Sequence, residues 1–247
     1  MMKEKRPIII IPARMSSTRL PGKPMALINN DPMIVHVWRR AMETNLGPVV
    51  VACDHEDIKD AVEAVGGKAV MTDPDLPSGT DRCYAALQAV DPEGEYTHII
   101  NLQGDLPTLE PDLIKAAYST MDIDGVDIGT LVCPIEDREE LEDPSVVKAV
   151  LSFVNDNTRA KALYFSRAAM PAGEGGHYHH IGIYVYSRDA LSKFVGLPPS
   201  GLEMREKLEQ LRALENGMRI DAVVVDTIPL GVDTPQDLEK AQGMLAG

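Results

Sequence analysis

A loop rich in cations, hydroxyl groups and turn-forming residues lies near the start of the sequence, in the stretch IIIIPARMSSTRLPGKPM. The four isoleucines predict a short buried strand, which would deliver Arg14, Arg19 and Lys23 to one edge of a sheet. Guanidinium groups, an ammonium and backbone N–H groups are the donors that cradle phosphates in proteins. The loop matches neither the Walker pattern nor the G-x-G-x-x-G dinucleotide fingerprint, and a solvated basic turn is the alternative interpretation.

The charge of the chain is unevenly spread. The formal net charge is −14, yet residues 1–40 contain eight lysines and arginines and only two acidic residues. A basic island in an acidic body favours a compact anion as the ligand. The overall acidity and the low aromatic content of 4% argue against nucleic acid as a partner.

The cysteines and the apolar segments indicate where such a protein works. Cys53, Cys83 and Cys133 lie far apart with no C-x-x-C pair, which favours buried thiols in a reducing cytoplasm. The apolar run near the start is too short for a signal peptide, and no stretch approaches the ~18 apolar residues of a membrane span. We therefore expect a soluble cytoplasmic protein with no membrane partner.

Short β-branched segments alternate with amphipathic helical segments in the first part of the chain. Strands are predicted at 7–12, 48–53, 68–72, 97–103 and 126–134. Helices are predicted at 32–44, 56–65, 80–90 and near 111–120. This alternation predicts an α/β fold, a doubly wound and mostly parallel sheet with helices on both faces.

The alternation changes after residue 145. Three strand-like segments with little helix between them predict a small antiparallel β insertion or lid over 145–200. A helix over 202–217, a strand over 220–226 and a last helix from residue 234 follow. We therefore expect a single α/β domain over 1–247 with an embedded smaller subdomain over 145–200.

Two aspartates follow predicted strands at the edge to which the cationic loop belongs. Asp105 comes after the strand 97–103, in NLQGDLP, and Asp233 follows the strand 220–226, in LGVDTPQDL. Ligands of open α/β sheets bind beyond the carboxyl ends of the strands, and two carboxylates beside phosphates suggest Mg²⁺. A turn or cap role for Asp105, and capping of the last helix by Asp233 or Thr234, are the alternatives.

Three weaker patterns accompany these residues. The segment PSGTDR places a flexible turn at a helix start, with Thr80 as a candidate N-cap. Strand alternation puts His180 and Tyr184 on one face, and a histidine on a strand is more often structural than catalytic. Helical spacing puts one polar set and one apolar set on opposite faces of 202–217: Glu203, Glu206 and Gln210 against Met204, Leu208 and Leu211.

The motifs, taken in order, resemble those of the 3-deoxy-manno-octulosonate (Kdo) cytidylyltransferase family. They are IPARMSSTRLPGKP, PSGTDR, NLQGD, ALYFSRA, HHIGIY, LEQLR and GVDTPQDL, and the resemblance runs from about residue 8 to about residue 246. It implies the Rossmann-like fold of the nucleotide-diphospho-sugar transferases. It also implies a cytoplasmic homodimer that activates Kdo with CTP and Mg²⁺ for lipopolysaccharide synthesis.

The resemblance also implies roles for individual residues. The nucleotide-binding positions would be Pro12, Ala13, Arg14, Ser17, Arg19, Lys23, Ser78, Gly79, Arg82 and Gln103. The substrate-binding positions on the Kdo side would be Gln103, Arg167, His180, Tyr184, Glu206, Glu209 and Gln210. Asp105 and Asp233 would hold the metal, and Arg14, Lys23, Asp105 and Asp233 would be catalytic.

Several alternatives stay open. Leu106 and His179 depart from the commonest forms of the family motifs, which leaves 8-amino-Kdo as a possible sugar acid. A sugar-nucleotide glycosyltransferase would share the fold and a metal, but it usually carries D-x-D where this chain has Q-G-D. A non-catalytic nucleotide sensor would need neither Asp105 nor Asp233.

Overall fold

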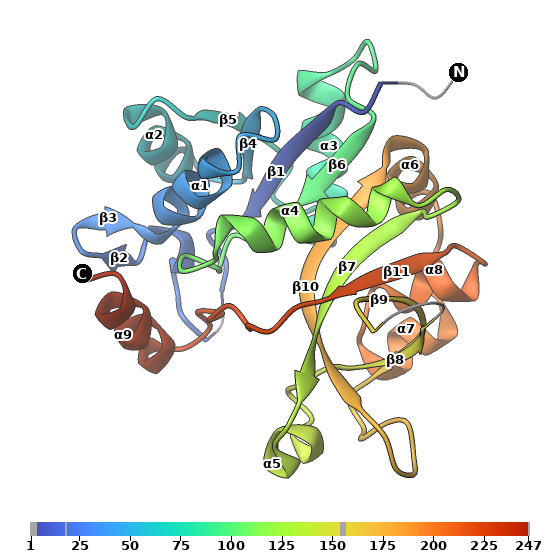
Figure 1. Ribbon diagram of the computed structural model, residues 1–247. Coiled ribbons are helices and arrows are strands. Elements are labelled where there is room, and N and C mark those ends of the chain that lie inside the picture. Colours follow the sequence, from blue (N-terminus) through green and yellow to red (C-terminus); the bar gives the residue numbers. More distant parts are fainter. Residues whose placement is uncertain (1–3, 18, 154–156, 247) are drawn as a thin grey trace. The chain divides into compact units, whose positions relative to one another are not determined.

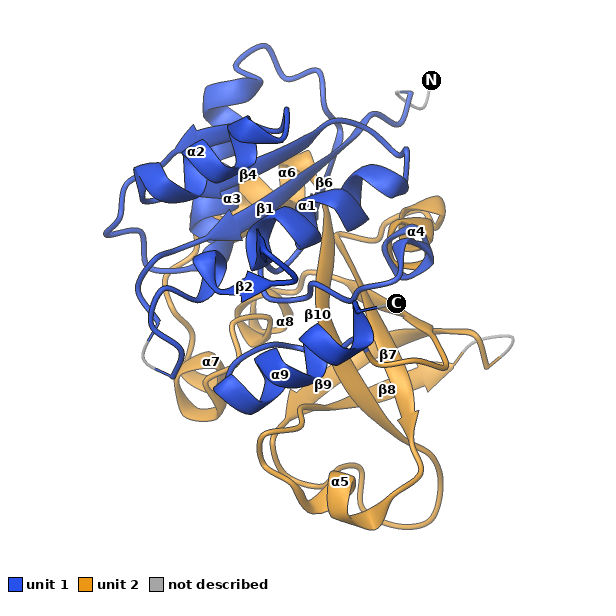
Figure 2. Cartoon of the chain, turned by 90° about the vertical axis from the view of Figure 1, so that its left-hand side faces the viewer, with its two compact units in different colours: residues 1–115, 229–247 blue, residues 116–228 orange. Residues whose placement is uncertain are grey.

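The computed structural model describes residues 4–17, 19–153 and 157–246. They divide into two compact units, Met1–Lys115 with Pro229–Gly247, and Ala116–Ile228 (Figure 2). The first unit is therefore made of two separate stretches of chain. The subdomain predicted at 145–200 lies within the second unit, which extends beyond it on both sides.

The first unit contains a parallel sheet with the strand order β5-β4-β1-β6 (Figure 1). Its strands are β1 (Pro7–Ala13), β4 (Val49–Cys53), β5 (Lys68–Met71) and β6 (His98–Asn101). The chain moves from β1 outward to β4 and β5, and then returns to the other side of β1 to form β6. The carboxyl ends of β1 and β6 therefore flank the point where the strand order reverses, which is where ligands bind in such sheets.

Helices connect these strands, as the sequence predicts. They are α1 (Met33–Glu43), α2 (Glu56–Ala64) and α3 (Gly79–Val90), and a further helix, α4 (Pro111–Ser119), follows β6. The isoleucines of β1 are almost completely buried because helices cover the sheet, so this strand is a continuous apolar run. After β6 the chain needs Gly104, because a Cβ there would lie 2.8 Å from the carbonyl oxygen of Pro12.

A small second core completes the first unit. The short 3₁₀ helix η1 (Lys23–Met25) leads into a hairpin of β2 (Leu27–Ile28) and β3 (Asp31–Pro32), and the last helix is α9 (Pro235–Met244). Ile28 and Met33 bury their side chains with Val232 and Ala241. The side-chain amide of Gln242 donates to the Leu27 carbonyl, so α9 is tied to the hairpin (Figure 1).

The second unit contains a sheet with the strand order β10-β7-β11-β9-β8, in which β10 also pairs with β8. Its strands are β7 (Ile128–Ile135), β8 (Lys148–Phe153), β9 (Arg159–Ser166), β10 (His177–Ser187) and β11 (Ile220–Val224). Only the pairing of β7 with β11 is parallel among those described here. The mostly parallel sheet expected from the sequence is thus found in the first unit, while the second unit is mixed.

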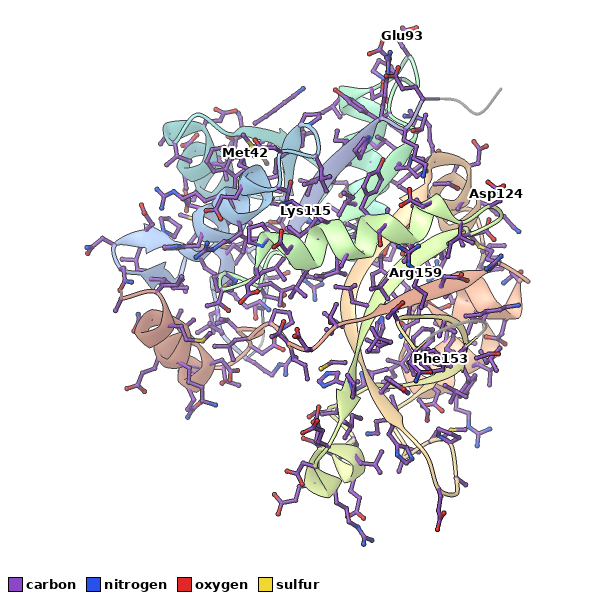
Figure 3. The ribbon with its side chains drawn as sticks, viewed as in Figure 1. Met42, Glu93, Lys115, Asp124, Phe153 and Arg159 are labelled. Carbon is purple, nitrogen blue, oxygen red and sulfur yellow. The ribbon has the colours of Figure 1, made fainter. Side chains whose placement is uncertain are left out.

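The chain connections are consistent with this difference. Strands β8 and β9 follow one another and pair antiparallel, whereas the parallel neighbours β7 and β11 are separated by the whole stretch between Ile135 and Ile220, and parallel pairing requires such a long crossover. Phe153 of β8 packs against Tyr178 of β10 with ring centroids 5.4 Å apart (Figure 3). Near the start of β9, the guanidinium of Arg159 donates to the Ser119 carbonyl (Figure 3). The remaining short helices are η2 (Thr120–Asp122), α5 (Arg138–Glu142), α6 (Arg188–Val195), α7 (Gly201–Glu206) and α8 (Leu211–Glu215).

The single helix predicted over 202–217 was wrong. The chain forms α7 and α8 instead, separated at Lys207, whose backbone is left-handed with φ 56°. An α-helix cannot continue through such a residue, so the two predicted faces do not exist. Met204 is accordingly 64% exposed, although the helical pattern placed it on the apolar face with Leu208 and Leu211, which are buried. The pattern also missed α6.

No helix in the described ranges is long and apolar enough to cross a bilayer. The three cysteines are buried and carry no disulfide, as expected. Burial, assisted by nearby acidic groups, raises the pKa of the Cys53 thiol to about 11, so this thiol is unreactive at neutral pH.

Candidate active site

A pocket of about 570 Å³ opens at the carboxyl ends of β1 and β6, within the first unit. Every residue assigned above to the nucleotide, the metal or catalysis lines it: Pro12, Ala13, Arg14, Ser17, Arg19, Lys23, Ser78, Gly79, Arg82, Gln103, Asp105 and Asp233. Four of these side chains are cationic and two are carboxylates. The lining is therefore basic in a protein whose net charge is −14.

The loop after β1 takes its course from local geometry. Gly22 adopts φ 67°, a left-handed conformation that a side chain would disfavour, and it reverses the chain just before Lys23. Lys23 begins the 3₁₀ helix η1, and Pro24, its second residue, fixes the backbone next to it. Earlier in the loop, the Met15 N–H donates to the Asp54 carboxylate at 2.8 Å.

Lys23 joins the two candidate metal-binding aspartates. Its Nζ lies 2.8 Å from Oδ2 of Asp105 and 3.0 Å from Oδ1 of Asp233. Burial alone would lower the pKa of the Lys23 ammonium, but the charges and hydrogen bonds of both aspartates outweigh burial, and the pKa is raised. Lys23 is therefore protonated at neutral pH. Its ammonium contacts both Asp105 and Asp233, although these aspartates lie far apart in the sequence.

Helix capping is carried out by neighbours of these aspartates. Thr234 is the N-cap of α9: its side chain accepts from the Asp237 N–H, and Asp237 reaches back to Thr234 in a capping box. The carboxylate of Asp233 is thus left for Lys23 and for Arg19, whose NH2 lies 3.0 Å from Oδ2 of Asp233. Of the described residues, only Lys23 contacts the Asp105 carboxylate, so Asp105 caps no helix there.

Arg14, another cationic residue of the pocket, is exposed there and pairs with no acidic group in the described part of the chain. Its guanidinium is therefore available to an anionic ligand.

The first turn of α3 lies at the same pocket. Ser78, and not Thr80, is the N-cap of α3: it accepts from the Asp81 N–H and donates to the Asp81 carboxylate. The amino-terminal end of α3 therefore lies at the pocket, where its partial positive charge favours an anion.

Arg82 is held deep in the pocket wall by a residue that the sequence reading missed. Its side chain is 3% exposed, donates to Thr72 and lies 3.7 Å from Oδ2 of Asp54, which is itself 7% exposed. Because Asp54 also accepts a hydrogen bond from the Met15 N–H, it connects the loop after β1 to Arg82 of α3. Its position directly after the strand β4 was an available signal, since strand ends of this sheet carry the other site residues.

The two aspartates of the pocket, Asp105 and Asp233, provide too few ligands to hold a hard cation such as Mg²⁺ without further donors. No cluster of three or more His, Cys, Asp or Glu side chains suited to a metal occurs among the residues described. Two carboxylates within reach of one ammonium can still provide two oxygen ligands, and Mg²⁺ is commonly bound by one or two carboxylates together with substrate phosphates. Asp105 and Asp233 therefore fit a metal that arrives with a nucleotide.

Apart from Gln103, which lines the pocket of the first unit, the candidate sugar-binding residues lie in the second unit and form two groups. In the first, the Glu206 carboxylate accepts from Ser166 Oγ at 3.2 Å and from the Arg167 N–H at 3.2 Å. Arg167 in turn donates through Nε to the Glu206 carbonyl and through NH1 to the Pro144 carbonyl. The carboxylate of Glu206 thus holds the end of β9.

In the second group, His180 and Tyr184 of β10 lie on one side, as strand alternation predicts. Their ring centroids are 5.4 Å apart, and Phe165 meets His180 edge-on at 4.8 Å. Burial, with a contribution from His179, lowers the pKa of His180 to about 3, so its ring is neutral at pH 7. Burial and the charge of Glu209 raise the pKa of Tyr184 well above its usual range. Gln210, the N-cap residue of α8, is buried.

Lys148 was also missed by the sequence reading. It is fully buried in β8, and its Nζ donates to the carbonyls of Asp143, Val146 and Arg167 at 2.7 to 2.9 Å. Burial lowers the pKa of this ammonium, but three carbonyl acceptors satisfy its three N–H donors. Lys148 therefore fixes the backbone of Arg167, and the lysine inside the apolar run SVVKAVL was the signal for it.

Comparison with known proteins identifies the family. The sheet, its pocket and a family model described as Cytidylyltransferase, which matches residues 8–220, define the chain as an α/β nucleotidyltransferase. A 3-deoxy-manno-octulosonate cytidylyltransferase from Paramagnetospirillum magneticum is 59% identical over 244 residues, covering 99% of each chain. One from Parvibaculum lavamentivorans is 61% identical, covering 97% of this chain and 93% of its own. The chain belongs to the 3-deoxy-manno-octulosonate cytidylyltransferase family.

Solved structures agree with this assignment. A CMP:2-keto-3-deoxy-manno-octonic acid synthetase in complex with CTP is 40% identical, with a TM-score of 0.88 over 98% of this chain and 99% of its own. A cytidylyltransferase from Leptospira borgpetersenii has a TM-score of 0.60 over 97% of this chain at 15% identity, which shows the shared fold alone.

Proposed function

We propose that the protein transfers the cytidylyl group of CTP to 3-deoxy-manno-octulosonate, giving CMP-Kdo and pyrophosphate for lipopolysaccharide synthesis. The observation that carries the proposal is the pocket that gathers Arg14, Arg19, Lys23, Asp105 and Asp233 at the switch point of the sheet. The names of the relatives supply the identity of the nucleotide and of the sugar acid. The same reaction on 8-amino-Kdo is the alternative within this chemistry.

In the proposed reaction the anomeric hydroxyl of the sugar attacks the α-phosphorus, and the bond to the β-phosphate oxygen breaks. Phosphoryl transfer depends mainly on positioning and on neutralising charge, so no covalent nucleophile is required. Arg14 and Arg19 would hold the triphosphate, since both are exposed in the pocket. Lys23 and the amino-terminal end of α3 would stabilise the charge that develops on the leaving pyrophosphate.

Asp105 and Asp233 are proposed to hold Mg²⁺, which when bound would neutralise phosphate charge and polarise the reacting oxygens. Lys23 would then exchange its two aspartate partners for phosphate oxygens. This exchange keeps the ammonium paired with anionic oxygens in both states. On the sugar side, Arg167, His180, Tyr184, Glu206, Glu209, Gln210 and Gln103 remain the proposed contacts.

The test is pyrophosphate release with CTP, Mg²⁺ and Kdo, with 8-amino-Kdo, sialic acid and UTP in parallel reactions. Release with CTP and Kdo only is the expected result. Release with the amino sugar alone would keep the chemistry and change the substrate. Tight CTP binding without pyrophosphate release from any pair would show that the protein is a sensor, and release of free nucleotide from a sugar nucleotide would show a glycosyltransferase.

Two further proposals rest on the family resemblance. The first is a cytoplasmic location, which the three buried free thiols support. The second is a homodimer formed through the second unit. A hollow of about 270 Å³, lined by Leu151, Phe153 and Tyr178 among others, is compatible with such an interface. Sedimentation of the purified protein would decide the oligomeric state.

A further inference from the structure

Thr130 lies opposite an irregularity in β10. Ile181 pairs with Leu131 and Val185 pairs with Gly129. The register therefore advances by four residues in β10 but by only two residues in β7. Such a bulge interrupts the ladder and redirects the side chains near it. Thr130, which is fully buried, fills the interruption: its Oγ1 lies 3.1 Å from the Ile181 carbonyl and 2.9 Å from the Ile183 carbonyl.

The same hydroxyl oxygen lies 3.0 Å from Nε2 of His180. A threonine hydroxyl has one proton, and a carbonyl oxygen can only accept. The proton of Thr130 is therefore directed to the bulge carbonyls, Ile181 or Ile183, and its oxygen is left as an acceptor. Nε2 of His180 must then carry the proton and donate it to Oγ1.

This assignment determines what the other ring nitrogen can do. His180 is neutral, because burial and the neighbouring His179 hold its pKa far below 7, so it carries a single N–H. With that proton on Nε2, Nδ1 presents a lone pair and can only accept a hydrogen bond. Within the described part of the chain, nothing hydrogen-bonds to Nδ1, while Phe165 and Tyr184 fix the plane of the ring.

We infer that Thr130 is a positioning residue that holds His180 as the Nε2–H tautomer, so that Nδ1 accepts a hydrogen bond from a hydroxyl group of the sugar acid. The inference rests on the proposed function and makes it more specific. A carboxylate has only acceptor atoms, so an acceptor nitrogen cannot hydrogen-bond to it. His180 therefore accepts from a hydroxyl group of the sugar. The carboxylate must be bound by a donor such as Arg167.

The tautomer can be measured directly in the protein without substrate. Two-bond ¹H–¹⁵N correlation spectra of histidine-labelled protein distinguish an Nε2–H ring from an Nδ1–H ring, and His180→Asn assigns the signal. We expect the Nε2–H pattern for His180 at pH 7. An Nδ1–H pattern or a doubly protonated ring would overturn the inference without any need for a Thr130 variant.

The positioning role is tested with Thr130→Val, which keeps the shape and removes the hydroxyl, and with Thr130→Ser, which keeps the hydroxyl. We expect Thr130→Val to lose the pure Nε2–H pattern and to raise the KM for Kdo about tenfold, the effect of one lost hydrogen bond, with the KM for CTP unchanged. Thr130→Ser should keep both the Nε2–H pattern and the KM for Kdo of the wild type. An unchanged KM for Kdo in a folded Thr130→Val protein would contradict the role.

The proposed function and the tautomer of His180 are tested by separate measurements. A wild-type protein that releases no pyrophosphate with CTP and Kdo would contradict the proposed function and the sugar contact with it. The spectrum of His180 would still decide whether Thr130 sets the tautomer. If Thr130→Val fails to fold, binding of Kdo to Thr130→Ser and to His180→Gln replaces it. Gln offers an acceptor near the same place, so it should retain more affinity than His180→Phe, and equal loss in both would count against an acceptor role.

Discussion

The ammonium of Lys23 lies 2.8 Å from Oδ2 of Asp105, across 82 residues of sequence. The pair joins the loop after β1 to the loop after β6, on the two sides of the switch point. Lys23 also reaches Asp233, which Arg19 contacts as well, so one ammonium bridges the two acidic groups of the pocket. The lysine proposed to bind phosphate is thus also the group that links the two carboxylates.

Lys23→Ala is expected to lower kcat by ~10²–10³, the usual loss when a preorganised charged donor is removed. The measurement is steady-state pyrophosphate release with CTP and Kdo. Lys115→Ala is the matched control, because Lys115 is an exposed lysine of α4 that pairs with Asp112 (Figure 3). Normal turnover in the Lys23→Ala enzyme would refute its assigned role.

Asp105→Asn and Asp233→Asn should each raise the Mg²⁺ concentration that gives half-maximal activity. Each change removes one of the two carboxylate charges proposed to hold the metal. The Mg²⁺-dependent rise of Tm in the presence of CTP provides a reading that does not depend on turnover, and it should shrink in both variants. Asp112→Asn, at an exposed helix position, is the control. If the metal response of Asp105→Asn equals that of the wild type, this aspartate is not a ligand.

Asp54→Asn should destabilise the fold by about 3 kcal/mol, because it leaves the buried guanidinium of Arg82 without its anionic partner. Urea unfolding at pH 7 measures this directly. Asp57→Asn is a suitable comparison, since Asp57 is exposed on α2 and its side chain is 66% accessible. A midpoint that stays at the wild-type value would mean that Asp54 contributes little beyond its hydrogen bond to Met15.

The buried ring of His180 predicts a pH dependence of stability. Its folded pKa of about 3 lies below the ordinary value of about 6.5, so between these values only the unfolded chain binds the proton. The free energy of unfolding therefore falls as the pH falls through this window, by up to about 1.4 kcal/mol per pH unit, and is independent of this group above it. Urea midpoints at pH 7 and pH 5 should differ more in the wild type than in His180→Asn, and parallel behaviour would contradict the burial argument.

The pocket could be predicted because it follows from strand ends. Once β1 and β6 were recognised as parallel strands, Lys23 and Asp105 had to meet at one edge, and the structure brings them into contact. Asp54 obeys the same rule and could have been found by applying it to β4. The competing cap roles were harder to separate, since only coordinates show that Thr234 and Ser78 do the capping.

The parts that could not be predicted depend on tertiary contacts. Helical periodicity continues through Lys207, and nothing in its residue type announces a left-handed backbone there. Glu206 ends α7 because its carboxylate and its carbonyl both bind Arg167, 39 residues earlier, which no local pattern can reveal. Thr130 was equally invisible, because its role arises from a bulge in a neighbouring strand.

The interrupted first unit has a consequence for how the protein is made. Asp233 lies in the stretch 229–247, which rejoins residues 1–115 only after the whole second unit has been synthesised, and its contact with Lys23 spans 210 residues. A nascent chain that has emerged as far as residue 228 already contains Lys23 and Asp105 but lacks the second carboxylate. Translation order therefore delays assembly of the complete pocket to the last step, and a ribosome that stalls earlier releases a polypeptide without it.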